Sequence, residues 1–224
     1  MILSRGRRYI FIHIPKTGGT SMALALEARA MKDDILLGDT PKARRRRHRV
    51  AGIASRGRLW KHATLADIEG LASPAEIDDF FVFTLIRNPW DRIASYYLWL
   101  RGQGFSHPAV TLAKGRGFSD FIRDPLIVRS FEPSPYASYV RESFGREKCN
   151  LFIRLEAFER DSAPLCQHLG FDLTLPRVNS VDESVKAELV YRPADRKFID
   201  SLCAEDIERF GYVAEMSSYY QSGA

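Results

Sequence analysis

The stretch that most constrains the fold is "FIHIPKTGGTSM", Phe11 to Met22. Before it, the β-rich apolar residues of "RRYIFIHI" predict a buried strand bounded by Pro15. After it, "GGTSMALALEARAMK" is rich in Ala and Leu, which are strong helix formers. The chain is therefore expected to pass from a strand through a tight glycine loop into a helix.

The remaining pattern repeats this alternation. Two more apolar runs, "DDFFVFTLI" and "CNLFIRL", predict buried strands, and "RNPWDRIASYYLWLR" and "ERDSAPLCQHLG" predict helices after them. Further helices are expected in "HATLADIEGLA", in "SPYASYVRESFG", which would end at its glycine, and in the C-terminal part up to Gly211. Strands that alternate with helices predict an α/β fold, here a P-loop-like three-layer α/β/α arrangement with a central parallel sheet and extra C-terminal helices.

Length and composition fit one domain spanning residues 1–224, with a Gly- and Pro-rich insertion at 102–135 that holds one short helix around "FSDFIRD". No run approaches the ~20 apolar residues of a membrane span, and the N-terminal region lacks the features of a signal peptide. These features indicate a cytoplasmic protein without a membrane span. The three cysteines and five histidines are scattered, which predicts buried thiols and no metal site.

The glycine loop has the composition of an anion site. Peptide N–H groups of a loop entering a helix converge on one place, and the helix dipole adds positive potential there. Gly18 and Gly19 let the backbone approach closely, and Lys16 adds a full charge. Hydroxyl donors come from Thr17, Thr20 and Ser21. The alternative is a strand-to-helix turn that needs its glycines only for geometry.

A second strand end also carries a cation. "FFVFTLI" ends in Arg87, where a P-loop NTPase places a metal-binding Asp, and a guanidinium binds phosphate oxygens rather than a metal. Asn88 is expected to cap the following helix, with Pro89 in its first turn, so Ser95 lies about 9 Å along it on the face of Asn88. Alternatively, Arg87 and Asp91 form a surface ion pair and Ser95 is a neutral helix residue.

Together, the two strand ends resemble those of sulfotransferases, which use 3′-phosphoadenosine-5′-phosphosulfate (PAPS). "IPKTGGTS" is similar to the family's 5′-phosphosulfate loop, and "IRNPWDRIASYY" resembles its 3′-phosphate motif. "RLEAFERD" and "DIERFGY" resemble the carbohydrate branch related to heparan sulfate 2-O- and chondroitin sulfotransferases, which includes short bacterial members.

The resemblance implies metal-independent, in-line transfer of a sulfuryl group from PAPS to a hydroxyl, which leaves adenosine 3′,5′-bisphosphate (PAP). Lys16 would stabilise the charge that develops on the bridging oxygen. Arg87 and Ser95 would hold the 3′-phosphate, and Arg177, with Asn179 and Ser180, falls where family members close over the cofactor. The expected cofactor-binding residues are Lys16, Thr17, Gly18, Gly19, Thr20, Ser21, Arg87, Ser95 and Arg177.

The acceptor hydroxyl needs a general base, for which His62 in "WKHATLADI" is the candidate, because a histidine in this region acts as the base in the resembling branch. The alternative is a structural histidine that caps the following helix with Thr64. His13, inside the strand, is expected to be packed or to support a neighbouring site residue, whereas His48 or His107 would replace His62 if it is not the base.

The formal net charge is +5, and much of the excess lies in "KARRRRHR", Lys42 to Arg49, expected to be loop with some helix. We expect a hydroxyl-bearing acceptor, a saccharide by resemblance, bound by Arg45, Arg46 and His107 with the help of the 102–135 insertion. The run would otherwise be a solvated loop or a nucleic-acid patch.

Two other classes of function stay open. A P-loop kinase or NTPase is disfavoured because the lysine precedes the glycines and no Asp ends the second strand. A non-enzymatic nucleic-acid binder would use the arginine run but leaves both anion sites unexplained, and no nucleic-acid-binding motif is visible, so no nucleic acid is expected as a partner.

Overall fold

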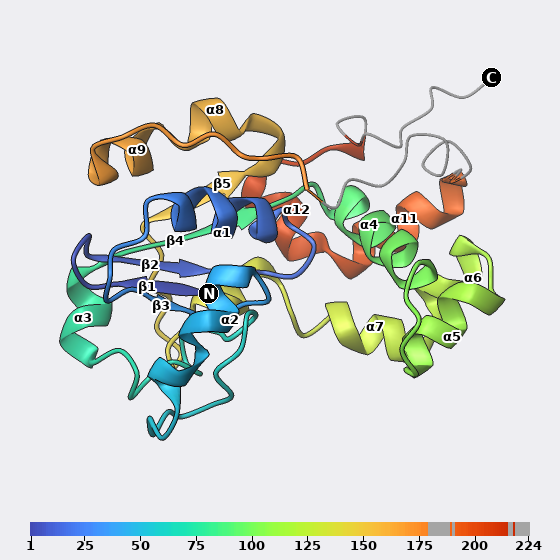
Figure 1. Cartoon of the computed structure of the whole chain (residues 1–224). Helices are drawn as coiled ribbons and strands as arrows, with labels where there is room; N and C mark the ends of the chain where they lie inside the picture. Colours follow the sequence, from blue (N-terminus) through green and yellow to red (C-terminus); the bar gives the residue numbers. More distant parts are fainter. Residues whose placement is uncertain (179–188, 190, 215–216, 218–224) are drawn as a thin grey trace. The chain divides into compact units, whose positions relative to one another are not determined.

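The computed structural model describes residues 1–178, 189, 191–214 and 217 (Figure 1). The chain forms two compact units. The first unit comprises Met1–Ile86 and Tyr136–Val178, and the second comprises Arg87–Pro135 with the described residues after 178.

The first unit is built on a five-stranded sheet in the order β3-β1-β2-β4-β5. β2, β4 and β5 run parallel, with Ile12 opposite Thr84 and Ile86 opposite Arg154. The α/β class with a mostly parallel sheet is therefore confirmed. The strands are β1 (Ile2–Ser4), β2 (Tyr9–Ile12), β3 (Ile35–Leu36), β4 (Phe81–Ile86) and β5 (Leu151–Arg154).

One edge of the sheet departs from the predicted parallel order. β1 pairs antiparallel with both β2 and β3, so the sheet begins with an N-terminal hairpin. β1 has three residues and β3 has two, which is too short for a period-2 pattern to be read from the sequence.

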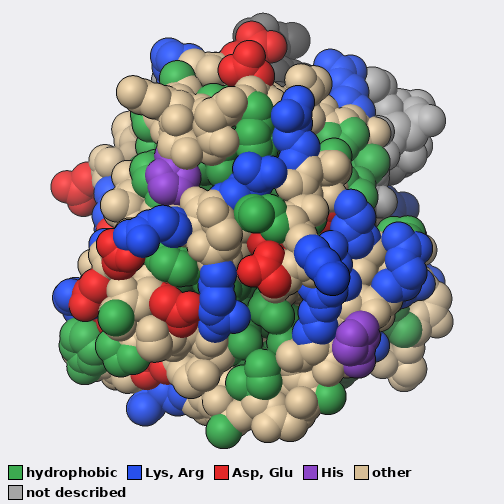
Figure 2. Space-filling model, turned by 60° about the vertical axis from the view of Figure 1, so that its left-hand side comes forward, with side chains coloured by type: hydrophobic (Ala, Val, Ile, Leu, Met, Phe, Trp, Pro, Cys, Tyr) green, Lys and Arg blue, Asp and Glu red, His purple; other side chains and the backbone are tan. Residues whose placement is uncertain are grey.

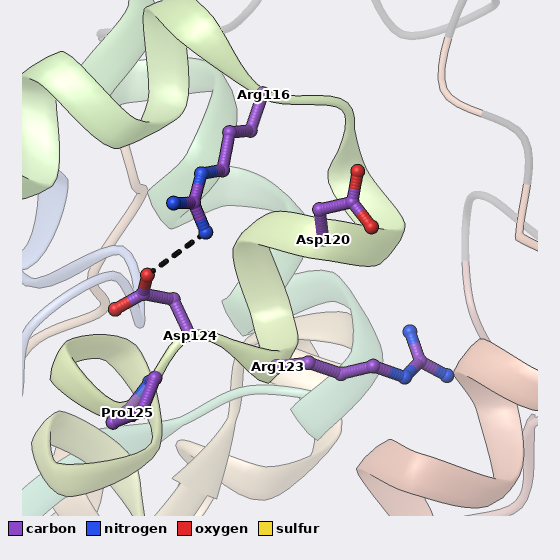
Figure 3. A pocket seen from close by; sticks show the side chains of 5 residues that line it. All are labelled: Arg116, Asp120, Arg123, Asp124 and Pro125. Carbon is purple, nitrogen blue, oxygen red and sulfur yellow. Dashed lines mark hydrogen bonds and ion pairs between the residues drawn. The ribbon is translucent and has the colours of Figure 1, made fainter.

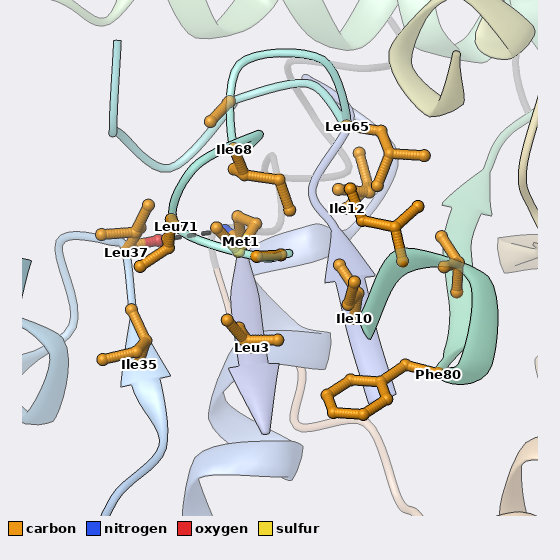
Figure 4. Packing of buried hydrophobic residues seen from close by; sticks show 14 of the residues in the cluster. Met1, Leu3, Ile10, Ile12, Ile35, Leu37, Leu65, Ile68, Leu71 and Phe80 are labelled. Carbon is orange, nitrogen blue, oxygen red and sulfur yellow. Dashed lines mark hydrogen bonds between the residues drawn. The ribbon is translucent and has the colours of Figure 1, made fainter. Parts of the chain in front are cut away.

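The sheet separates two apolar layers because neighbouring strand residues point to opposite faces. Leu3, Ile10 and Ile12 pack on one face against the segment 63–72 and the α3 residue Ile77 (Figure 4). Tyr9 and Phe11 pack on the other face with residues of α1, α8 and α9 (Figure 1). The first unit therefore has the three-layer order that was predicted. Its helices are α1 (Gly19–Ala28), α2 (Pro41–Arg46), η1 (Arg47–Val50), α3 (Pro74–Asp79), η2 (Tyr136–Val140), η3 (Leu155–Ala157), α8 (Phe158–Asp161) and α9 (Ala163–Leu169).

Two expected helices of the first unit are not formed as predicted. Residues 62–72 are turns: the Asp67 carboxylate accepts from the Thr64 N–H at 2.8 Å, and the Asp67 N–H donates to the Thr64 hydroxyl at 3.2 Å. Gly70, at φ 95°, then turns the chain out of helical geometry. "SPYASYVRESFG" is helical only as the 3-10 helix η2, and Gly145, at φ 92°, lies in a turn after it.

The second unit is helical in its described part. Asn88 caps α4, accepting from the N–H groups of Trp90 and Asp91, and Pro89 is the first helical residue, as predicted. The C-terminal helices end at Gly211, also as predicted. The elements are α4 (Pro89–Arg101), α5 (Pro108–Gly115), α6 (Phe118–Arg123), α7 (Pro125–Phe131), α11 (Pro193–Leu202) and α12 (Ala204–Phe210).

Residues 102–135 hold three helices, not the single one predicted. Pro108 and Pro125 stand at helix starts, capped by His107 and Asp124, whose side chains accept from the backbone N–H groups of Ala109 and Leu126. The prolines that indicated a loop therefore begin helices, a position where the missing N–H costs nothing.

Candidate functional site

The predicted anion loop follows β2 and has two residues in the left-handed region, Lys16 at φ 67° and Gly18 at φ 86°. The Thr17 hydroxyl donates to the Ile14 carbonyl at 2.9 Å, and the Thr17 side chain is fully buried. This hydroxyl fixes the shape of the loop, so the donor predicted at Thr17 is used by the backbone of the loop itself.

Each glycine has a structural reason: Gly18 adopts a positive φ, and Gly19 lies against the His13 ring. A Cβ on Gly18 would lie 2.8 Å from Leu155 Cδ1, and one on Gly19 would lie 2.0 Å from His13 Cδ2. Contacts this short do not occur between real side chains, so the glycines serve the geometry of the turn. That need is compatible with anion binding, because the same absence of side chains exposes the peptide N–H groups.

The start of α1 supports an anion site. Its N-cap is Gly18, no described side chain caps it, and the first turn contains no acidic residue. The first N–H groups of a helix have no partner within the helix, and the dipole makes this end positive. Thr20 and Ser21, both half-buried, lie in this first turn and add hydroxyls.

His62 is bonded to the segment that leads into the loop. Its Nδ1 lies 2.8 Å from the His13 carbonyl oxygen. Because a carbonyl only accepts, the proton is on Nδ1, and Nε2 carries the lone pair. The rings of His13 and His62 meet edge to face, with centroids 4.6 Å apart. The structure thus brings the predicted base to the end of β2.

Both histidines are neutral near pH 7. Burial lowers the pKa of His62 to about 4; the bond to the His13 carbonyl opposes this shift, and Lys61 and the Met1 amino group add to it. Burial likewise holds the pKa of His13 well below its usual value. A neutral imidazole with Nε2 unprotonated is the form that accepts a proton.

Trp60 is a neighbour of His62 that the sequence analysis did not assign. Its ring meets His62 edge to face at 5.0 Å, it is 40% exposed, and the Arg58 guanidinium lies 5.3 Å from its centre. Lys61 forms an ion pair with Asp39 at 2.8 Å. The sequence signal was the position of Trp60 in "WKHATLADI", two residues before the candidate base.

The residues after β4 belong to the second unit. Arg87 directly follows β4 and pairs with Asp91 at 3.9 Å, with side chains only 19% and 4% exposed. The ion pair of the alternative interpretation is therefore formed, but its side chains are largely buried rather than on the surface. Ser95 lies on α4 and is buried, as are Asn88 and Asp91 on the face that the helical spacing predicted.

The basic run forms α2 and η1 rather than mainly loop. Its arginines fall into two groups, one bonded to the backbone and one exposed. Arg46 and Arg49 donate to carbonyls of residues 31–34, including that of Asp34, which both share. Arg44, Arg45 and Arg47 are exposed. Figure 2 shows basic side chains (blue) gathered over part of one face.

Part of this run lies near Lys61. A hydrogen bond from Lys61 is the main cause that lowers the pKa of Asp39, and the charges of Arg44 and Arg47 lower it further. Electrostatic effects of this kind need proximity, so Arg44 and Arg47 lie in the neighbourhood of Asp39, the ion-pair partner of Lys61.

The other predicted residues have simpler positions. His107 is exposed and caps α5 through Nδ1. Arg177 is exposed in an irregular segment of the first unit. Asn179 and Ser180 lie outside the described residues.

The second unit also contains a cavity of about 360 Å³ lined by residues of α6 and the start of α7 (Figure 3). Arg116 pairs with Asp124 at 3.1 Å, and Arg123 pairs with Asp195 at 2.6 Å. The two arginines that line this cavity are thus balanced by carboxylates, which makes the cavity a poor anion site.

Within the described part of the chain, no group of three or more His, Cys, Asp or Glu side chains is placed to hold a metal ion. No helix among the described residues is long and apolar enough to cross a membrane.

The site is thus an uncapped helix start behind a lysine-bearing glycine loop, with a neutral histidine bonded to the same segment. No protein-family model and no curated protein matches the chain. Among solved structures, it is similar to mouse sulfotransferase SULT7A1 complexed with PAP, at 14% identity and a TM-score of 0.49, covering 91% of this chain and 86% of that one. A likeness this distant establishes neither a family nor an activity.

Proposed function

We propose that the chain is a sulfotransferase that uses PAPS and an acceptor hydroxyl, with a saccharide as the acceptor. The observation that carries this proposal is the uncapped start of α1 behind Lys16, with His62 bonded to the His13 carbonyl beside it. An anion cradle and a neutral base on one segment fit the transfer of an anionic group to a hydroxyl.

In this proposal, the loop binds the 5′ end of the cofactor. The N–H groups of residues 17–21 and the hydroxyls of Thr20 and Ser21 hold phosphate and sulfate oxygens. The loop suits such a group because no side chain caps the start of α1 and neither Gly18 nor Gly19 carries one. Bound PAPS would supply the sulfuryl group, and the Lys16 ammonium would stabilise negative charge at the bridging oxygen.

Arg87 and Ser95 hold the 3′-phosphate, and Arg177 closes over the cofactor. Arg87 suits this role because it directly follows β4 and its planar guanidinium can bind two phosphate oxygens at once. A buried guanidinium gains more from a phosphate than an exposed one, because screening by water is weaker.

His62 Nε2 accepts the proton of the attacking hydroxyl, while the His13 carbonyl keeps the Nδ1 proton in place. A histidine with a pKa of about 4 is a weak base. Negative charge at the neighbouring loop would raise this pKa, because an anion stabilises the imidazolium. His62 therefore becomes a better base when the anion site is filled.

The acceptor lies toward the basic run. Arg45 and Arg46 remain the proposed contacts, with Arg46 also bound to backbone carbonyls, and His107 and the 102–135 region add to the acceptor side. The exposed indole of Trp60 beside His62 offers an apolar surface for a sugar ring. We also propose a cytoplasmic location.

The competing proposal, a P-loop NTPase, predicts a different ligand. We expect PAP to raise the melting temperature without Mg²⁺, because a ligand that binds only the folded state stabilises it by about 2.7 kcal/mol at 100 times its Kd. Thermal unfolding with PAP, 5′-AMP and ATP-Mg²⁺ measures this. Stabilisation by ATP-Mg²⁺ but not by PAP would refute the sulfotransferase proposal.

The 3′-phosphate assignment is tested in the same assay with Arg87→Ala. This variant should lose the preference for PAP over 5′-AMP, whereas Arg129→Ala, at an exposed position in α7, should keep it. An unchanged preference in Arg87→Ala would move the 3′-phosphate site elsewhere.

A further inference from the structure

His13 occupies a position that the proposed mechanism does not use. It follows β2 directly, its side chain is only 7% exposed, and its ring is stacked on Phe11 with centroids 6.0 Å apart. A buried histidine in such surroundings is commonly a packing residue. His13 differs because it touches both parts of the candidate site.

On the loop side, the His13 ring lies against the first residue of α1. A Cβ on Gly19 would come within 2.0 Å of Cδ2 and 2.4 Å of Nε2 of this ring. The ring therefore packs directly against the backbone of the first residue of α1.

On the base side, the backbone of the same residue holds His62. The His13 carbonyl accepts the Nδ1 proton of His62 at 2.8 Å, and the two rings meet at 4.6 Å. Strand pairing in β2 ends at Ile12, so this carbonyl lies outside the ladder and is satisfied by His62 instead. The ring and the carbonyl of one residue thus reach the two parts of the site.

The contact between the two rings depends on both staying neutral. The charge of Lys61 lowers the pKa of both rings, and Asp39 raises that of His62. The Met1 amino group lowers the pKa of both rings only when it is protonated, and burial lowers its own pKa to about 4. Burial keeps both rings neutral, which allows them to touch without repulsion.

We propose that His13 is a positioning residue that couples the glycine loop to His62, so that the shape of the anion site and the orientation of the base change together. This inference rests on the proposed function for its catalytic consequence, but the coupling itself is a property of the fold.

The test is a double-mutant cycle with Gly19→Ala and His13→Ala. Gly19→Ala alone should destabilise the protein strongly, because the new methyl group meets the His13 ring. His13→Ala removes that ring, so the two substitutions should not act independently. The increase in the unfolding equilibrium constant of the double variant should be smaller, by about tenfold or more, than the product of the increases in the two single variants. If Gly19→Ala gives no folded protein, recovery of folded protein in the double variant is the same result.

A matched control uses Gly104→Ala, because nothing lies within 4 Å of a Cβ placed there. Its effect should simply multiply with that of His13→Ala. Multiplicative effects for Gly19→Ala as well, or no recovery in the double variant, would overturn the coupling.

A second readout follows the base itself. Removal of the His13 ring admits water beside His62, so in His13→Ala the pKa of His62 should rise from about 4 toward 6.5 in an NMR titration of its ring nitrogens. The same variant should bind PAP more weakly. An unchanged His62 titration would reduce His13 to a packing residue.

The cycle and the titration need neither donor nor acceptor. If both succeed while PAP gives no thermal shift to the unsubstituted protein, the coupling stands and the sulfotransferase proposal fails. If PAP binds but the cycle is multiplicative, the proposed function stands and the coupling fails.

Discussion

Lys16 is one of two non-glycine residues with positive φ in the described part of the chain, the other being Arg8 in the β1–β2 turn. A side chain at φ 67° costs of order 1 kcal/mol, and it persists only where the surroundings hold it. Here the bond from Thr17 to the Ile14 carbonyl and the left-handed Gly18 fix the residues on both sides. The left-handed backbone places this strain in the loop that we propose binds the anion.

This strain separates two substitutions of Lys16. Both Lys16→Ala and Lys16→Gly should lose nearly all sulfuryl transfer, because each removes the ammonium. Lys16→Gly should be the more stable variant by about 1 kcal/mol, since glycine adopts positive φ without cost. Urea unfolding and turnover with labelled PAPS measure the two effects.

Lys16→Arg is the matched control, because it keeps the charge and the strained backbone and should retain part of the turnover. Equal stability of the Ala and Gly variants would show that position 16 stores no strain. Full turnover in Lys16→Gly would remove Lys16 from the mechanism.

For single residues, the sequence showed the local role of a residue better than it showed which distant residues it contacts. The glycines, the helix start and the cap at Asn88 are readable because each depends on near neighbours. The burial of the Thr17 hydroxyl, the contact of Gly19 with His13 and the bond of His62 to the His13 carbonyl depend on residues that folding brings together. No local pattern encodes such contacts.

Among the elements, α4 begins shortly after β4 ends, and Asn88 stands at its start. Asn88 is fully buried, and its side-chain oxygen accepts from the N–H groups of Trp90 and Asp91. Asn88→Ala should lower the free energy of unfolding by about 1 to 2 kcal/mol, because those N–H groups lose their acceptor. Asn88→Ser retains a neutral acceptor at the cap and should lose less; equal losses in both variants would contradict the capping role. Chemical denaturation measures the difference.

The predictions of helices and strands were confirmed where the sequence pattern was long or ended in a clear stop signal. β4 is a run of six residues, five of them buried, and α9 and α12 end at the glycines that the sequence indicated. The segment 62–72 has apolar residues at helical spacing but forms turns, because the Thr64–Asp67 bonds close a single turn and Gly70 ends it. Periodicity reports which side chains are buried, and here turns bury the same residues.

For the whole molecule, the buried histidine pair links folding to pH. The pKa of His62 is about 4 in the folded chain and 6.5 in the unfolded chain, so between these values the unfolded state binds the extra proton. The free energy of unfolding therefore falls as pH drops below 6.5, and His13 acts in the same direction. The Met1 amino group, whose pKa burial also lowers to about 4 from 8.0, adds to the loss.

His62→Asn isolates the contribution of one histidine, because the Asn amide can still donate to the His13 carbonyl but does not titrate. Between pH 7.5 and pH 5, His62 should account for about 2 kcal/mol of the lost stability, at 1.36 kcal/mol per pKa unit. The variant should therefore lose about that much less than the unsubstituted protein over this range. Urea unfolding at the two pH values measures both losses, and the other titrating groups are common to both proteins. Parallel losses would mean that His62 is protonated in the folded state near its usual pKa, and would remove the buried neutral base from the proposed mechanism.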